Sequence, residues 1–262
     1  MEVKVENLSY KREEKLILEN INIVGRQDYC TTILGKSGSG KTTLLHAIEG
    51  SLPIEKGKIL HREKEIAQEF SIGFLPTYLN DFFKMEIVKE EIEYRKNLYQ
   101  KTDIDVKECL LLLGLSTSIY DYKIRNLKNC DQKLLALFCL LLKGPSLYLL
   151  DEPTIGMPII VQKKIEKILF YLKRKGKILF VTTRDSDLAL RISDYIYIIK
   201  DGKIMREGEK YGLLKKTILL RQMGLSIPKT IHFSKKVERY KKIKIGYRDD
   251  INDLIKDIFR YV

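Results

Sequence analysis

Cysteine, histidine and long apolar runs are scarce in this sequence, and each shortage excludes a class of protein. The 262 residues include four cysteines and three histidines, which are too scattered to predict a disulfide framework or a His/Cys metal site. The longest apolar run, residues 134–142, has nine residues, against the roughly 20 of a transmembrane helix. The amino terminus lacks the basic and apolar blocks of a secretory signal. We therefore expect a cytoplasmic protein that does not span a membrane by itself.

Bulk composition indicates an ordinary globular chain with an excess of positive charge. Hydrophobic residues make up 44% and charged residues 32%, with a net charge of +13, which excludes collagen-like and wholly disordered chains. Residues 201–262 hold 16 basic and 8 acidic residues, so +8 of the excess lies there. A basic tail can be a solvated face or can contact anionic lipid or nucleic acid. The first is favoured, because apolar residues interrupt the lysines.

Short apolar strands alternate with helical patterns along most of the chain. Residues 81–143 carry helical spacing, within 85–98, 106–113 and 134–142. Helical spacing also marks 42–49, and Asp201-Gly202 is a strong hairpin turn. Strands are expected at 21–23, 31–34, 71–75, 147–150, 177–182, 195–199 and 203–207. Strands separated by helices predict an α/β fold with a mainly parallel sheet covered on both faces.

A phosphate-binding loop follows the strand at 31–34. Residues 35–42 read Gly35-Lys36-Ser37-Gly38-Ser39-Gly40-Lys41-Thr42 and fit G-x-x-x-x-G-K-[ST], between a strand and a helix. The glycines let successive N–H groups face one point, where the helix N-terminus adds positive potential. Lys41 is expected to reach the β- and γ-phosphates, Thr42 to ligate Mg²⁺, and Thr43 to complete the site. A chance turn of this composition is the minor alternative.

Two adjacent acids after a buried strand supply the second half of a nucleotide site. Asp151 stands at the end of the strand at 147–150, where a carboxylate can hold the metal, and Glu152 follows as a candidate base for the attacking water. The same pair could be a surface turn. Together with the upstream phosphate loop, the catalytic interpretation is preferred.

These motifs, in this order, resemble those of the nucleotide-binding subunits of ATP-binding cassette transporters over residues 1–220. The resemblance implies a P-loop NTPase core, an added antiparallel β part and a helical subdomain inserted at about 78–143. It also implies ATP and Mg²⁺ as cofactors and a head-to-tail dimer in which each ATP meets the partner's signature sequence. A membrane-embedded transporter subunit is the expected partner, at the cytoplasmic face of the membrane.

Several positions depart from the pattern of that family. Residues 127–131, Leu-Lys-Asn-Cys-Asp, stand where Leu-Ser-Gly-Gly-Gln is usual, so a hydroxyl and two glycines near the γ-phosphate are replaced. Thr77 occupies the place of a glutamine, and Pro158 that of an aspartate. Arg184 replaces the histidine that usually contacts the γ-phosphate, and arginine does not exchange a proton near neutral pH.

The residue that stacks on adenine is left open between two candidates. Tyr10 is the nearby aromatic side chain, whereas the register favours Arg12. A planar guanidinium can stack on a base, so the departure weakens rather than excludes base binding.

The last 42 residues, 221–262, are expected to form a separate basic C-terminal extension. Residues 221–228, with the basic stretch and helix after them, resemble the C-terminal extension of ATPases of energy-coupling factor transporters. Asp249 and Asp250 are possible caps of a terminal helix. Its apolar stripe has helical spacing and consists of Ile251, Leu254, Ile255, Ile258, Phe259 and Val262.

Three functions are compatible with these residues. The first is an ATPase subunit that drives a membrane protein, and the second is a nucleotide-binding regulatory subunit that scarcely hydrolyses ATP. Glu152 supports the first, while Lys128 and Arg184 support the second. A nucleic-acid machine is disfavoured, because the chain has one phosphate loop and no long heptad run, and no nucleic-acid partner is expected. The altered signature favours a heterodimer with a different cassette over a homodimer.

Overall fold

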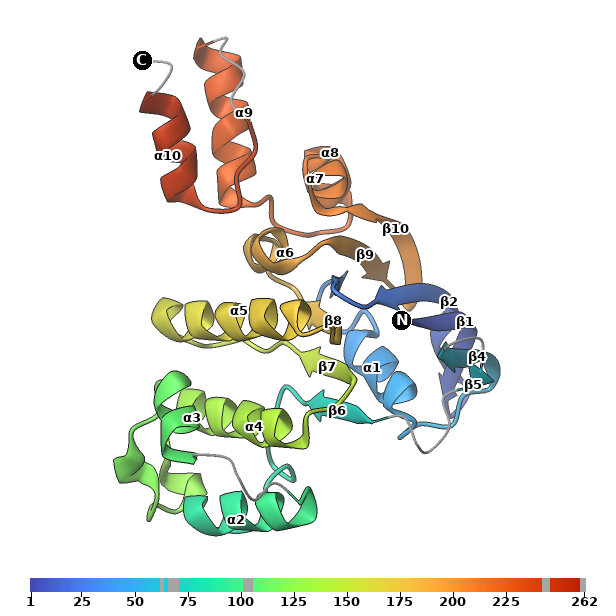
Figure 1. Ribbon diagram of the computed structural model, residues 1–262. Coiled ribbons are helices and arrows are strands. Elements are labelled where there is room, and N and C mark those ends of the chain that lie inside the picture. Colours follow the sequence, from blue (N-terminus) through green and yellow to red (C-terminus); the bar gives the residue numbers. More distant parts are fainter. Residues whose placement is uncertain (62–63, 66–70, 101–105, 242–245, 260–262) are drawn as a thin grey trace.

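Two β-sheets and ten α-helices make up the part of the chain that the computed structural model describes, residues 1–61, 64–65, 71–100, 106–241 and 246–259 (Figure 1). The antiparallel sheet has the order β2-β1-β4-β5, and the larger sheet has the order β10-β9-β3-β8-β7-β6. Pairing from β9 through β6 is parallel, and β10 is antiparallel to β9. The predicted α/β class is confirmed.

The strands of the large sheet lie close to the predicted ranges. They are β3 (Cys30–Leu34), β6 (Ile72–Leu75), β7 (Leu147–Asp151), β8 (Ile178–Thr183), β9 (Tyr195–Lys200) and β10 (Lys203–Glu209). Asp201 and Gly202 both have positive φ, 50° and 76°, as a tight hairpin turn requires. The small sheet consists of β1 (Glu2–Arg12), β2 (Lys15–Arg26), β4 (Lys56–His61) and β5 (Lys64–Glu65), of which only the centre of β2 was predicted.

The helices include five elements that the sequence analysis did not assign, α5, α6, α7, α8 and α9. The structure has α1 (Lys41–Glu49), α2 (Val88–Leu98), α3 (Val106–Leu112), α4 (Asn129–Lys143), α5 (Ile159–Arg174), α6 (Ser186–Ile192), α7 (Lys210–Leu214), α8 (Thr217–Gln222), α9 (Lys229–Lys241) and α10 (Ile251–Phe259). Two 3-10 turns, Thr117–Ile119 and Ile124–Asn126, join α3 to α4. The predicted helical segment within 81–143 thus contains α2, α3 and α4.

Alternate residues of β7 separate two hydrophobic layers. Leu147 and Leu149 pack with α1 and the small sheet, whereas Tyr148 and Leu150 pack with α4, α5 and the insert helices. This alternation follows from the two-residue period of a strand. Both faces of the sheet are therefore covered, so its strand ends are the edges open for chemistry.

The C-terminal extension packs on the rest of the chain. Ile231 of α9 is buried in a cluster with α6, α7 and α8, and Asp249 accepts hydrogen bonds from Lys210 Nζ and Tyr211 Oη, both at 2.6 Å. The predicted terminal helix is confirmed as α10. Leu254 of its stripe is buried while Ile255 is 43% exposed. Val262 lies outside the described residues, as do the side chains of Ile258 and Phe259.

Every helix in the described ranges is too short or too polar to traverse a lipid bilayer.

Candidate active site

The phosphate loop lies at the end of β3 and leads directly into α1. A side chain at Gly35 would place its Cβ 2.6 Å from the Ile199 carbonyl oxygen, so only glycine fits between the loop and β9. Gly38 and Gly40 have φ of 78° and 102°, in the left-handed region that glycine adopts without strain. The loop therefore curls over the N-terminus of α1, the arrangement that presents backbone N–H groups to an anion.

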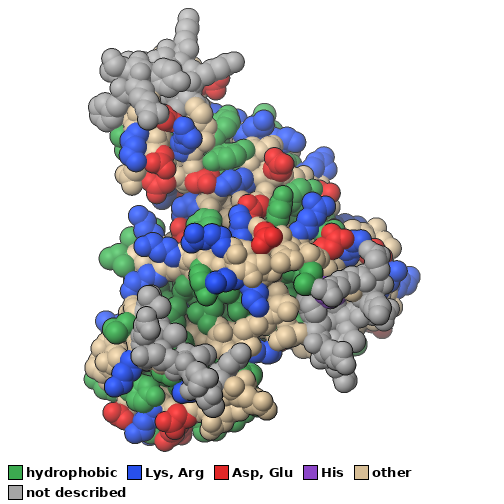
Figure 2. All heavy atoms as spheres, in the orientation of Figure 1, with side chains coloured by type: hydrophobic (Ala, Val, Ile, Leu, Met, Phe, Trp, Pro, Cys, Tyr) green, Lys and Arg blue, Asp and Glu red, His purple; other side chains and the backbone are tan. Residues whose placement is uncertain are grey.

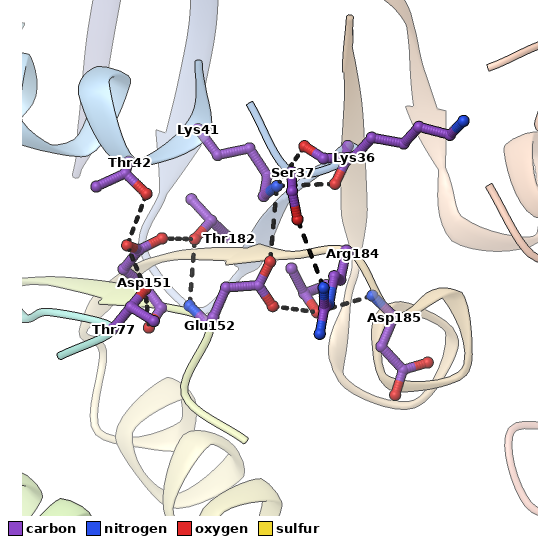
Figure 3. A network of polar contacts seen from close by, with 12 residues as sticks. Lys36, Ser37, Lys41, Thr42, Thr77, Asp151, Glu152, Thr182, Arg184 and Asp185 are labelled. Atoms are coloured by element: carbon purple, nitrogen blue, oxygen red, sulfur yellow. Dashed lines mark hydrogen bonds and ion pairs between the residues drawn. The ribbon is translucent and has the colours of Figure 1, made fainter. Parts of the chain in front are cut away.

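Lys41 lies inside this curl rather than in solvent. Its ammonium donates to the carbonyl oxygens of Gly35 and Lys36, both at 2.8 Å, and lies 3.6 Å from Glu152 Oε1. Burial lowers the pKa of Lys41, and the two nearby carboxylates, Glu152 and Asp151, oppose that shift. The lysine is thus a buried cation at the loop that the sequence assigned to phosphate (Figure 3).

Asp151 is a fully buried carboxylate surrounded by hydroxyl groups. It accepts hydrogen bonds from Thr42 Oγ1 at 2.8 Å, Thr77 Oγ1 at 2.6 Å and Thr182 Oγ1. Four parts of the chain meet at this side chain, namely the phosphate loop, the segment around Thr77, β7 and β8 (Figure 3). The carboxylate and hydroxyl oxygens are the hard ligands that Mg²⁺ prefers, so the donor set fits the predicted metal site.

Glu152 follows on a bent backbone that turns its carboxylate toward Lys41. Its φ is 44°, an uncommon value for a non-glycine residue and frequent at functional sites. The Glu152 amide donates to the Thr182 carbonyl at 3.1 Å, and Thr183 Oγ1 donates to Glu152 Oε2 at 3.3 Å. Burial raises the pKa of Glu152, while Lys41 acts against that rise. A raised pKa favours proton acceptance near neutral pH.

Arg184 reaches the rim of the phosphate loop from the end of β8. Its Nη1 lies 3.5 Å from Ser37 Oγ. The next residue, Asp185, caps α6 by accepting hydrogen bonds from the amides of Asp187 and Leu188 at 2.8 and 3.3 Å. This cap fixes the backbone that carries Arg184. The residue assigned in place of the histidine therefore lies on the phosphate side of the site.

The remaining predicted binding residues have different surroundings. Lys36 and Ser37 are exposed, and Ser39 Oγ is buried without a hydrogen-bond partner in the structure. Thr43 lies in the first turn of α1. The orphaned Ser39 hydroxyl, beside a loop rich in N–H groups, agrees with a loop that folds around an anion.

The two adenine candidates lie on β1, and the strand pairing brings Tyr10 close to the loop. Tyr10 pairs with Leu18 of β2, and a Cβ at Gly40 would lie 2.9 Å from Leu18 Cδ2. Tyr10 packs partly buried against the core, whereas Arg12 is exposed. The choice between them stays a prediction.

The altered signature segment lies away from the chain's own phosphate loop. Lys128 and Asn129 are exposed at the N-terminus of α4, whose first turn is closed by bonds from the amides of Asp131 and Gln132 to the Lys128 carbonyl. Within the described ranges, no hydrogen bond or ion pair joins 127–131 to 35–43. The segment therefore faces outward, where another molecule can reach it.

Lys133 is a site residue that the sequence analysis missed. From α4 its Nζ donates to the carbonyl oxygens of Pro76 and Thr77, at 2.6 and 2.9 Å, and it is 4% exposed. Burial lowers the pKa of Lys133 to about 8. Since the Thr77 hydroxyl bonds to Asp151, Lys133 connects the insert to the metal site. The available signal was a lysine directly before the apolar run at 134–142.

Comparison with known proteins agrees with this geometry. The family model described as ABC transporter matches residues 18–155, just over half of the chain. The chain belongs to the ABC transporter family. It is thus a P-loop ATPase of the cassette type, and ATP binding follows from that membership. Pro158, which stands in the place of the family's aspartate, directly precedes α5 and lies outside the matched range.

Relatives and solved structures extend the similarity into the tail. The chain is 31% identical to a putative ABC transporter ATP-binding protein of Clostridium tetani over 79% of its length, but spans only 49% of that relative. It is 27% identical to the energy-coupling factor transporter ATP-binding protein EcfA of Methanocaldococcus jannaschii, over 94% of this chain and 92% of that one. The fold of cbiO1 from Clostridium perfringens, part of the ABC transporter complex cbiONQ, superposes with a TM-score of 0.70 at 24% identity, covering 89% of this chain and 98% of that one.

Proposed function

We propose that this chain is the ATP-binding subunit of an ABC transporter that closes against a second cassette and thereby moves a separate membrane-embedded subunit. The observation that carries the proposal is the convergence of Lys41, Thr42, Asp151 and Glu152 at the carboxyl ends of β3 and β7. Its place of action is the cytoplasmic face of the membrane, as a peripheral subunit.

Each residue then has a definite role. The loop amides and Lys41 hold the phosphates, and Thr42 with Asp151 holds Mg²⁺, which supplies charge neutralisation when bound. Glu152 accepts the proton of the attacking water, since it is a carboxylate beside the phosphate loop. Arg184 binds a phosphate oxygen as a fixed cation. Thr77 orients Asp151 through its hydroxyl.

A heterodimer suits this chain better than a homodimer. In a head-to-tail dimer, the exposed Lys128 and Asn129 meet the partner's nucleotide, where small donors stabilise the transition state in the family pattern. In a homodimer, both nucleotide sites would meet this altered signature segment. A partner cassette with an intact signature would supply the missing small donors to the site built on Lys41 and Glu152.

The resemblance to energy-coupling factor ATPases supports a narrower version of the proposal. The similarity to the Methanocaldococcus jannaschii protein covers 94% of this chain, which includes part of the extension at 221–262. On this support we propose that the chain is an energy-coupling factor ATPase, with the membrane subunit of such a transporter as its partner.

The second candidate is a regulatory subunit that binds ATP and scarcely hydrolyses it. Arg184 favours it, because an arginine at 3.5 Å from Ser37 Oγ can hold a phosphate but does not relay a proton. Steady-state hydrolysis by the chain with its co-purified cassette and membrane subunits tests both. Turnover that is lost in Glu152→Gln supports the ATPase, whereas tight ATP binding without turnover in the complex supports the regulator.

A further inference from the structure

An apolar groove between α4 and α5 lies on the side of β7 that faces the insert. Its volume is about 860 Å³, within the ~300–1,000 Å³ typical of small-molecule sites. Phe138 and Leu142 of α4 line it together with Ile168 and Leu172 of α5. In Figure 2, hydrophobic side chains bordered by basic ones are visible in this region. None of the groove residues belongs to the nucleotide site, so the catalytic function does not account for it.

Four lysines border the groove, and their charge is uncompensated. Lys164, Lys167, Lys175 and Lys177 all line it, and no acidic side chain does so among the described residues. In the part of the chain that the structure describes, none of these four lysines forms an ion pair. The Lys177 Nζ donates to the Gly144 carbonyl at 3.2 Å, and the Lys175 ammonium lies over the Tyr171 ring. Like charges around one apolar groove repel one another, and an anion would offset that repulsion.

Tyr148 places a polar group among the apolar side chains. The side chain lines the groove and is 1% exposed, yet its hydroxyl has no hydrogen-bond partner in the described ranges. Burial raises the pKa of Tyr148, with Tyr171 as a further contribution, so it remains a neutral donor. Because the side chain lines the groove, this hydroxyl can donate to a ligand oxygen there.

From this combination we propose that the groove binds a single-chain acyl carboxylate, a fatty-acid-like anion. The acyl chain lies along Leu141, Ile168 and Tyr171, whose side chains line the groove and are accessible from it, and the carboxylate meets the lysines. A small ligand is favoured over a partner protein, because thirteen residues line the groove against roughly 20–30 per side in a standard protein interface.

The test is titration calorimetry of the full chain with octanoate, decanoate and dodecanoate below their micelle concentrations, with 1-decanol as the neutral analogue. Because each buried methylene contributes about 0.8 kcal/mol, affinity should rise up to about fourfold per CH₂. Decanoate should bind more tightly than decanol, and salt should weaken only the decanoate.

Three variants sharpen the test. The double variant Lys164→Gln/Lys167→Gln should remove the preference for decanoate over decanol. Lys163→Gln, exposed on the same helix and outside the groove, should retain it. Tyr148→Phe should weaken binding by roughly 2- to 10-fold. Unchanged MgATP affinity in each variant shows that the fold is intact.

The proposal is overturned if dodecanoate gives no saturable binding to the parent chain. It is also overturned if the double variant and Lys163→Gln bind decanoate equally well, or if only an acidic amphipathic peptide binds. These readouts do not depend on hydrolysis, so they stay separate from the proposed transport function.

Discussion

The phosphate-binding half of the cassette and the segment offered to a partner cassette differ sharply in this chain. Around Asp151, every expected oxygen and cation is present, and Lys41 lies 3.6 Å from Glu152. At the N-terminus of α4, the exposed Lys128 and Asn129 replace the small residues of the family pattern. The chain keeps the phosphate-binding and metal-binding side chains of its own nucleotide site, with Arg184 in place of the family's histidine, while the segment at 127–131 departs from the family pattern. This difference supports our proposal of an asymmetric pair of cassettes.

The largest effect is expected at the intact half. Lys41→Ala should weaken ATP binding by about 30-fold or more, because truncating one partner of a buried charged contact costs about 2–5 kcal/mol. Titration calorimetry measures it, with Lys163→Ala as an exposed control. Unchanged affinity would refute the phosphate-loop assignment.

Glu152→Gln should slow hydrolysis by about 100-fold or more while ATP still binds, since general-base catalysis contributes about 10²–10⁴-fold. ATP should then accumulate in a closed dimer. In the parent, lowering the pH should slow hydrolysis as Glu152 becomes protonated. Because the pKa of Glu152 is raised, this loss of rate should begin at a higher pH than it would for an exposed glutamate. Hydrolysis at the parental rate in Glu152→Gln would show that another group accepts the proton.

Lys133→Met tests the link between the insert and Asp151. Loss of the bonds to Pro76 and Thr77 should lower kcat about tenfold with little change in ATP affinity, because it releases the Thr77 hydroxyl that orients Asp151. The matched control is Lys143→Met on the same helix, whose Nζ donates to the Ile72 carbonyl at 2.5 Å, away from the metal site. Equal losses of kcat in the two variants would reduce Lys133 to a structural role.

The sequence predicted the large sheet and the phosphate loop because both are local patterns. A strand, three glycines and a helix start fix the loop within 12 residues, and Asp151 ends an unbroken apolar strand. Contacts between side chains that are distant in the sequence were not predicted. Thr182 and Lys133 reach the metal site from elements 31 and 18 residues from Asp151, and no local pattern encodes those contacts.

The missed helices have different causes. Helix α5 buries Ile165, Leu169 and Leu172, whose helical spacing is itself a local pattern that predicts a helix. Helix α9 buries Ile231 and Ser234 in a lysine-rich segment, so its apolar face is too narrow to stand out. Its helix depends on packing against α6 and α8, which is tertiary information.

The smallest expected effect is at Arg184. Arg184→His should raise hydrolysis a few-fold in the heteromeric complex, where a histidine can orient the water, and less in the isolated chain, where the altered signature still limits the rate. Parallel steady-state assays of both preparations measure this difference. An equal gain in both preparations would mean that Arg184 acts independently of the partner's signature.

The most direct test of the asymmetry is the hydrolysis rate of the purified chain alone against the same chain bound to a second cassette with an intact signature. We predict slow turnover alone and at least tenfold faster turnover in the heteromer, with the gain lost when Glu152→Gln is introduced in this chain. Turnover by the isolated chain as fast as the heteromer would contradict the account, because Lys128, Asn129 and Arg184 would then be adequate substitutes.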